Sequence, residues 1–326
     1  MHMADALVSP QVAGITGLIS AGVIFIATRK VRNSDTDNII PLMGVMGAFI
    51  FVSQMINFSV PGTGSSGHII GGILLSSILG PWAAFITLSS VLIIQCLLFA
   101  DGGLMAIGCN ILNMAVCSCL IAYPFIYKPL MSYPASFTRI MFVSILSCLI
   151  GLELGAIFVT IQTELSGITA LPFNKFLILM VSIHFLIGIS EGIATGFILF
   201  FIQKFRPDLF FSSKKETTQS LSRFGKPALF FALLSLIGGL FTWISSSKPD
   251  GLEWSILELT GSTEIQTHPS NHVLKFFSEM QKSTALIPDY NSTFAGIIGG
   301  IIVVLVVWVI TKIVHKNKLL SNKNNE

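Results

Sequence analysis

Residues 61–82 read PGTGSSGHIIGGILLSSILGPW, and this stretch decides what kind of fold the chain can adopt. An apolar segment of about 12 residues runs from His68 to Leu79, and at 1.5 Å per residue it extends only about 18 Å. The hydrocarbon core of a bilayer is about 30 Å thick, so this helix cannot cross it. Pro81 then begins the next helix, as proline often does. We therefore expect the short helix to be shielded by other helices, with the glycine-rich loop before it lining a cavity.

The composition supports a membrane protein. Of the 326 residues, 52% are hydrophobic and only 11% are charged, and the mean hydropathy is +0.80. This is too apolar for a soluble globular domain of ordinary composition, so the fold class that we predict is an all-α polytopic membrane protein. The net charge of +3 is small, and the basic residues fall between apolar runs. That pattern reports membrane topology and does not indicate a nucleic-acid partner.

The distribution of basic residues predicts the orientation. No basic residue precedes the first apolar run, whereas Arg29, Lys30 and Arg32 follow it directly, which places the N-terminus outside and the loop at 29–38 in the cytoplasm. The chain has roughly nine membrane segments, and an odd number places the C-terminus inside. All but four of the 19 Lys and Arg residues then fall on the cytoplasmic side. The segments run over residues 12–28, 39–57, 68–79, 82–99, 103–126, 138–162, 173–203, 227–245 and 293–314.

The chain begins Met1-His2, and this pair offers three nitrogen ligands: the terminal amine, the deprotonated backbone nitrogen of His2 and its imidazole. Together they form fused chelate rings, and a fourth nitrogen would complete a planar set that favours Ni²⁺ or Cu²⁺. His68 is the candidate fourth ligand, because its loop is predicted on the same side of the membrane as the N-terminus. Two plainer interpretations stay open: His2 lies in a disordered terminus, and His68 only caps a helix.

Several motifs resemble one family of membrane proteins, the CbiM/NikM-type substrate-binding subunits of energy-coupling-factor transporters for cobalt and nickel. The resemblance spans residues 1 to about 205, in the family's order and spacing. The motifs are MHMADALVSP at 1–10, SGHIIGG at 66–72, LGPWAA at 79–84, FADGG at 99–103, GCNILNM at 108–114 and HFLIGISEGIAT at 184–195.

This resemblance implies a fold and a ligand set. The implied core has seven helices, one of them short. In the family the metal is held by the terminal amine, the backbone nitrogen and imidazole of the second residue, and a His in a Ser-Gly-His loop. These ligands correspond to Met1, His2 and His68 in this sequence. The metal is the substrate, and no cofactor is implied.

The last third of the chain has its own signature. Pro249-Asp250-Gly251-Leu252-Glu253 resembles the small CbiN/NikN-type accessory subunit of the same transporters, here fused behind the core. We expect the accessory unit to assist metal loading of the core. The predicted division is a metal-binding core at 1–205, a cytoplasmic linker at 206–226, a two-helix accessory unit at 227–315 with an outer loop at 246–292, and a cytoplasmic tail at 316–326.

The function expected from these observations is substrate capture for an ATP-driven importer of cobalt ions, with nickel as the alternative. The chain contains no G-x-x-x-x-G-K-[ST] stretch, so we expect no nucleotide site, and we expect not an enzyme but a transport subunit without its own ATPase. By resemblance, ATP hydrolysis belongs to cytoplasmic ATPase subunits, and a transmembrane coupling subunit completes the complex in a prokaryotic cell membrane. Two other classes remain open: a secondary transporter that works alone, for which no internal repeat is evident, and an intramembrane metalloenzyme, which would need an open metal position.

Other polar residues fall within the predicted membrane segments. His184 and Glu191 are seven residues apart on one helical face, and we interpret them as packing residues that form interhelical hydrogen bonds rather than as ligands. Gln95, Asn110 and Asn113 are candidates to orient His2 or His68, because the second nitrogen of a metal-bound imidazole usually has a hydrogen-bond partner.

Overall fold

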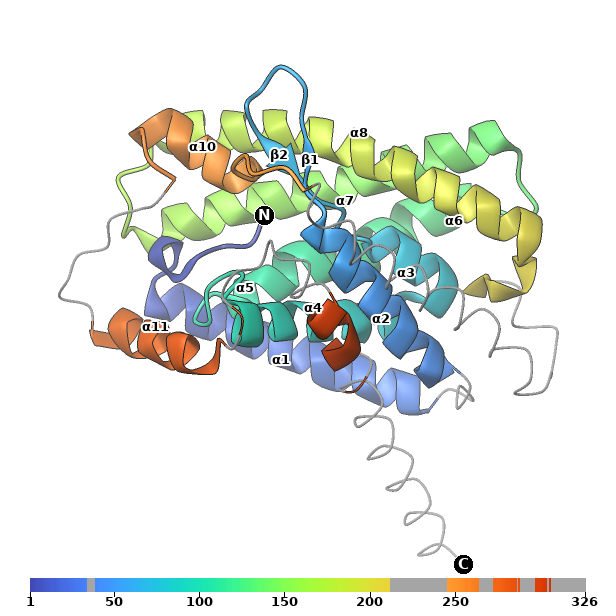
Figure 1. The fold of residues 1–326 in the computed structure, drawn as a ribbon, viewed down its shortest axis with the longest axis horizontal. Helices are drawn as coiled ribbons and strands as arrows, with labels where there is room; N and C mark the ends of the chain where they lie inside the picture. Colours follow the sequence, from blue (N-terminus) through green and yellow to red (C-terminus); the bar gives the residue numbers. More distant parts are fainter. Residues whose placement is uncertain are drawn as a thin grey trace, which may run out of the picture.

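The computed structural model describes residues 1–33, 39–211, 245–263, 272–285, 287, 297–303 and 305. Figure 1 shows a bundle of helices in this part of the chain. Five of its helices are long and apolar enough to cross a membrane. The all-α polytopic fold predicted from the sequence is therefore confirmed.

The core is built from seven helical segments, one of them short, as expected. One of the seven is continuous from Ile107 to Leu130 and is divided into α5 (Ile107–Asn110), η2 (Ile111–Tyr127), which has the wider turns of a π-helix, and α6 (Lys128–Leu130). The other six are α1 (Pro10–Arg32), α2 (Ile39–Met55), α3 (Gly72–Leu79), α4 (Pro81–Phe99), α7 (Phe137–Ser166) and α8 (Phe173–Phe205).

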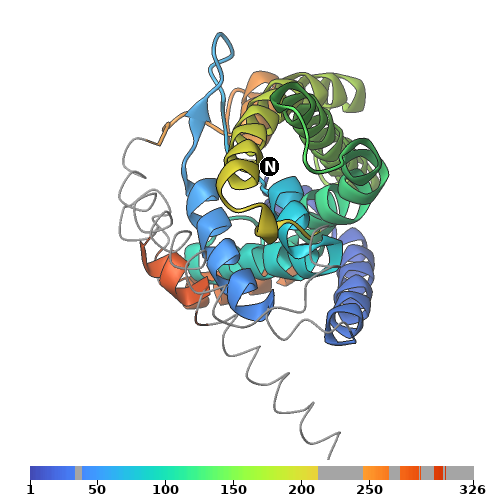
Figure 2. The same cartoon turned by 90° about the vertical axis from the view of Figure 1, so that its right-hand side faces the viewer.

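The short helix α3 lies inside the bundle. All of its residues are buried, and it contacts α2, α4, η2, α7 and α8. Figure 2 shows it enclosed by longer helices. Because α3 packs on protein, it does not need the length of a membrane span.

The helix α3 begins later than the sequence predicted, at Gly72 instead of His68. The reason is local: Gly71 has a left-handed backbone with φ of 81°, and the amides of Ile70 and Gly71 donate to the Glu191 carboxylate instead of entering a helix. His68 therefore lies on non-helical backbone, next to a two-stranded antiparallel ribbon of β1 (Phe58–Ser59) and β2 (Ser66–Gly67).

The N-terminal segment folds back into the bundle. It contains the 3-10 helix η1 (Asp5–Leu7), and the side chains of Met1, Met3 and Leu7 are buried. The Asn110 amide binds both backbone groups of Met3: Met3 N donates to Asn110 Oδ1 at 2.7 Å, and Asn110 Nδ2 donates to Met3 O at 3.2 Å. The label N in Figures 1 and 2 lies within the bundle as a result.

Part of the accessory unit is described. It contains α10 (Gly251–Thr260), which packs on α8, and α11 (His272–Thr284), which contacts α4 and η1. In Figure 1 both lie at the end of the bundle opposite α6. Residues 297–303 are helical. The predicted segment at 227–245 lies outside the described residues, except for Ser245, and so does most of the segment at 293–314.

Other helix bounds differ modestly from the prediction. The segment predicted at 103–126 begins four residues later and ends four residues later, and α7 extends to Ser166. The short 3-10 helix η3 (Pro207–Leu209) follows α8.

Candidate metal site

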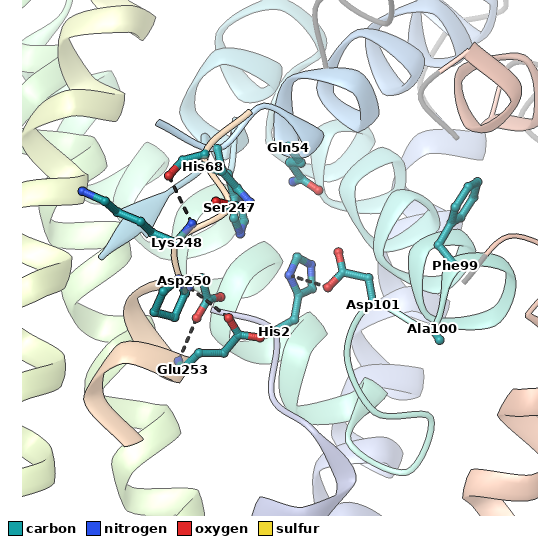
Figure 3. Close-up of a pocket in the computed structure, with 13 residues that line it drawn as sticks. His2, Gln54, His68, Phe99, Ala100, Asp101, Ser247, Lys248, Asp250 and Glu253 are labelled. Carbon is teal, nitrogen blue, oxygen red and sulfur yellow. Dashed lines mark hydrogen bonds and ion pairs between the residues drawn. The ribbon is translucent and has the colours of Figure 1, made fainter. Parts of the chain in front are cut away.

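A cavity of about 280 Å³ lies where the N-terminus, the loop before α3, the end of α4 and the start of α10 meet. Figure 3 shows His2, His68, Asp101 and Asp250 gathered from these separate elements around the same space. Among the residues that line it are His2, His68, Asp101, Asp250 and Glu253.

His2 and His68, two of the predicted ligands, lie side by side. Their rings are stacked, with centroids 5.3 Å apart and an interplanar angle of 23°. Burial lowers the pKa of each imidazole to about 3, and the nearby N-terminal ammonium acts in the same direction. Both rings are therefore neutral at physiological pH, with a lone pair available to a metal ion.

The position of His68 is set by the residues that follow it. Glu191 on α8 accepts hydrogen bonds from Gly71 N at 2.9 Å and Ile70 N at 3.1 Å. Gln54 on α2 donates to Ile70 O at 3.0 Å, and Gln95 on α4 donates to Gln54 Oε1 at 2.7 Å. Three core helices thus fix the backbone immediately after His68.

His2 is held by polar contacts, and a glycine lies close to it. Its Nδ1 lies 3.4 Å from Asp101 Oδ1, and a hydrogen bond with the Gln95 side chain acts to raise its pKa. Gly102 has φ of +80°, and a Cβ at this position would lie 2.9 Å from Asn110 Nδ2 and 3.2 Å from the Cβ of His2. The FADGG motif therefore lets the chain after α4 approach the N-terminal segment closely.

The terminal amine of Met1 forms an ion pair with Asp250 Oδ2 at 2.5 Å. Burial acts to raise the pKa of Asp250, but the adjacent ammonium and the hydrogen bonds that the carboxylate accepts outweigh it and hold the pKa well below its usual range. Asp250 was missed as a site residue in the sequence analysis. The available signal was an Asp with Glu three residues later, a capping-box pattern that indicates the start of a helix but not its contact with Met1.

The segment before α10 docks on the loop that carries His68. Ser66 N donates to Pro249 O at 2.8 Å, and Ser66 Oγ donates to Lys248 O at 2.7 Å. Gly251 lies against His184, where a Cβ would be 3.0 Å from His184 Cε1. The accessory unit therefore forms one wall of the cavity.

The remaining candidates occupy supporting positions. Glu191 forms the expected hydrogen bonds between elements, whereas His184 bonds within its own helix, its Nδ1 lying 2.8 Å from Met180 O. Asn110 holds the backbone of Met3 rather than a histidine, and Asn113 exchanges hydrogen bonds with Gln162. Within the described residues, no three His, Cys, Asp or Glu side chains are grouped to hold a metal ion. The Met1 amine and the His2 backbone nitrogen are not side-chain groups, so such a grouping does not include them.

Comparisons with known proteins match nearly the whole length of the chain. A family model described as the cobalt uptake substrate-specific transmembrane region matches residues 2–209, and the PDGLE domain model matches residues 225–316. A putative fused nickel transport protein of Archaeoglobus fulgidus is 28% identical over 322 residues, which cover 96% of this chain and 98% of the relative.

Two further relatives each match about two thirds of the chain. A putative metal transport protein of Haloquadratum walsbyi is 32% identical over 222 residues, covering 68% of this chain and 98% of the relative. The crystal structure of a truncated transition metal transporter is 30% identical with a TM-score of 0.55, covering 63% of this chain and 99% of that one.

Proposed function

This chain belongs to the family described as the cobalt uptake substrate-specific transmembrane region, and from that premise we propose that it captures a divalent cobalt or nickel ion for import. The observation that carries the proposal is the stacking of His2 on His68 in a cavity that is also lined by Asp250, the residue that pairs with the Met1 amine. Two of the four expected nitrogen donors, the His2 and His68 imidazoles, line this cavity, and a third, the Met1 amine, contacts a residue of its wall.

The proposed ligands are the Met1 amine, the backbone nitrogen of His2, the His2 imidazole and the His68 imidazole. The amine and the backbone nitrogen close a five-membered ring with the metal, and the backbone nitrogen and His2 Nδ1 close a six-membered ring. Chelation through Nδ1 would replace the contact between His2 and Asp101. A divalent ion bound to a deprotonated backbone nitrogen leaves a net charge of +1 at the site.

Cobalt is the substrate that we propose first, because the family description and the N-terminal motif both point to it. Nickel is the second candidate, and two observations favour it. Four nitrogens in a plane suit Ni²⁺, and the relative that shares the fused arrangement over nearly its whole length is named as a nickel transport protein.

We further propose that the chain works with a transmembrane coupling subunit and cytoplasmic ATPases in a prokaryotic cell membrane, with its N-terminus outside. The division into a core at 1–205, a linker at 206–226, an accessory unit at 227–315 and a tail at 316–326 belongs to the same proposal. The alternative is a secondary transporter that moves metal without such partners. Metal uptake into vesicles that contain only this chain would favour the alternative.

Isothermal titration of the purified full chain with Co²⁺ and with Ni²⁺ tests the ligand set. His2→Ala, His68→Ala and a chain extended by one residue before Met1 should each lose tight binding, whereas His272→Ala on α11 should bind as the native chain does. Mass spectrometry checks that the N-terminus is intact in each sample. Native affinity in the extended chain or in His2→Ala would refute the chelate, and the order of the two native affinities bears on the choice between cobalt and nickel.

A further inference from the structure

The two carboxylate oxygens of Asp250 make different contacts. Its Oδ1 accepts hydrogen bonds from Leu252 N at 2.8 Å and Glu253 N at 2.9 Å, which makes Asp250 the N-cap of α10. Its Oδ2 contacts the Met1 amine at 2.5 Å. One oxygen caps α10 and the other contacts the amine, so the two contacts do not compete for the same atom.

The place of this carboxylate is fixed from three directions. The carbonyls of Lys248 and Pro249 accept hydrogen bonds from Ser66, close to His68. Gly251 fits against His184 because it has no side chain. Glu253 Oε2 accepts from Asp250 N at 3.0 Å and closes the capping box. The side chain of Asp250 is only 17% exposed, so its charge is poorly screened by water.

We propose that Asp250 is a positioning residue and counter-ion of the metal site, supplied to the core by the accessory unit. The inference rests on the proposed chelate. It assigns to Asp250, which lines the same cavity as the two imidazoles, the task of holding the Met1 amine in place before the ion arrives.

Charge balance explains why this contact favours loading instead of blocking it. The ammonium carries +1, and the proposed chelate of a divalent ion with one deprotonated backbone nitrogen also carries +1. Asp250 therefore faces the same net charge in both states. A metal-bound amine keeps N–H groups that can donate to Oδ2, so the hydrogen bond need not be lost. A competing salt bridge would have to break on loading, whereas this one persists.

Two substitutions in the full chain separate the charge from the cap. Asn and Ser both cap helices well, so Asp250→Asn and Asp250→Ser keep α10 in place and remove the negative charge. Each should weaken binding of Co²⁺ and Ni²⁺ by roughly tenfold to a hundredfold, as expected for a hydrogen bond to a charged group. The visible absorption spectrum at saturating metal should stay native, because the four nitrogens are unchanged. Glu258→Gln, which removes a charge from an exposed position on the same helix, should bind as the native chain does.

A second measurement needs no metal. The rate at which an amine-reactive reagent modifies the N-terminus, followed by mass spectrometry, should rise in Asp250→Asn and stay native in Glu258→Gln. Native or tighter metal binding in Asp250→Asn would overturn the inference, tighter binding because it would mean that Asp250 competes with the metal. An unchanged modification rate would also overturn it. Both results leave the chelate standing as long as His2→Ala and His68→Ala lose binding, so failure here is distinct from failure of the proposed function.

Discussion

At the scale of single residues, Gly103 controls access of the N-terminal segment to the cavity. Its amide donates to Met3 O at 2.8 Å, and a Cβ at this position would lie 1.9 Å from Asp5 Oδ1 and 2.4 Å from Asp5 N. Backbone cannot give way as a flexible side chain can. Gly103→Ala should therefore displace the N-terminal segment and lower metal affinity by roughly tenfold or more in isothermal titration.

The matched control for this substitution is Gly14→Ala on α1, where no heavy atom lies within 4 Å of an added Cβ. Alanine is also a better helix former than glycine, so the control should keep its stability as well as its affinity. If Gly103→Ala binds metal as the control does, docking of the N-terminus in this position is not required for binding.

The two histidines predict how stability depends on pH. Their pKa is about 3 in the folded protein, whereas an exposed histidine titrates near 6.5, so the unfolded chain binds more protons between these values. Their contribution to the free energy of unfolding is therefore complete above about pH 6.5 and is lost as the pH falls toward 3. The thermal midpoint of the metal-free protein should fall between pH 7 and pH 5.

His68→Ala isolates this effect. Burial raises the pKa of Asp5, which acts on stability in the opposite direction, but Asp5 is present in both chains. The decrease of the midpoint with falling pH should be smaller in His68→Ala than in the native chain. Equal slopes in the two chains would mean that His68 is not buried in its neutral form.

The ligand residues and the residue that pairs with the amine differ in how far the sequence could predict them. Met1, His2 and His68 follow from nitrogen chemistry, a predicted common side of the membrane and a family resemblance. The proximity of His2 to His68 agrees with that expectation, and their binding of metal stays a prediction. The contact of Asp250 with Met1 joins residues 249 positions apart. No periodicity reports such a contact, since it depends on how the accessory unit docks on the loop at Ser66.

At the scale of the secondary-structure element, Glu191 connects the longest core helix to the shortest. Its carboxylate accepts hydrogen bonds from the amides of Ile70 and Gly71, just before α3. A negative charge at this position also interacts favourably with the helix dipole. Glu191→Gln keeps the size but has only one accepting oxygen, so one buried N–H loses its partner. The expected loss of stability is about 1–3 kcal/mol, and metal affinity should fall because His68 shifts with the loop.

Chemical unfolding and metal titration of the same samples check this prediction. The control is Ser190→Ala, a change at the neighbouring half-buried position of α8, where the hydroxyl bonds to Leu186 O in its own helix. Loss of stability without any change in affinity would show that Glu191 packs the bundle but does not position His68.

The elements were predictable to different degrees for physical reasons. Apolar runs of membrane length identify α4, α7 and α8, and the short run between His68 and Pro81 correctly predicted a buried helix that does not span. The start of α3 was predicted four residues too early, because the segment before it is apolar, as a helix would be. The helix does not begin earlier because the amides of Ile70 and Gly71 donate to the Glu191 carboxylate on α8, more than 100 residues away in sequence.

At the scale of the whole molecule, the distribution of basic residues predicts an orientation that labelling can check. The five native cysteines are all buried, so labelling of an introduced cysteine should have little background from the native ones. Thr263→Cys follows α10 and should react with a membrane-impermeant maleimide on intact cells. Ser132→Cys lies in the loop between α6 and α7 and should react only after permeabilisation. Both residues are exposed, and the reverse pattern would invert the predicted topology.

The fused arrangement allows the contribution of the accessory unit to be separated from that of the core. The family model of the core matches residues 2–209, and a relative that matches only 68% of this chain is covered over 98% of its own length, so we expect residues 1–211 to fold without the rest. The truncated core retains Met1, His2 and His68 but lacks Asp250 and the segment that binds Ser66. It should therefore bind metal more weakly than the full chain by at least the factor lost in Asp250→Asn, since both lack the same carboxylate.

Residues 212–326, co-expressed as a separate chain, should restore the affinity of the core only when they carry the native Asp250. The same chain with Asp250→Asn should still co-purify with the core, because the hydrogen bonds from Ser66 to Lys248 and Pro249 involve backbone carbonyls. Isothermal titration of the two co-purified complexes then measures the carboxylate alone. A truncated core that binds metal as tightly as the full chain would restrict the accessory unit to later steps of transport, after the ion has reached its ligands.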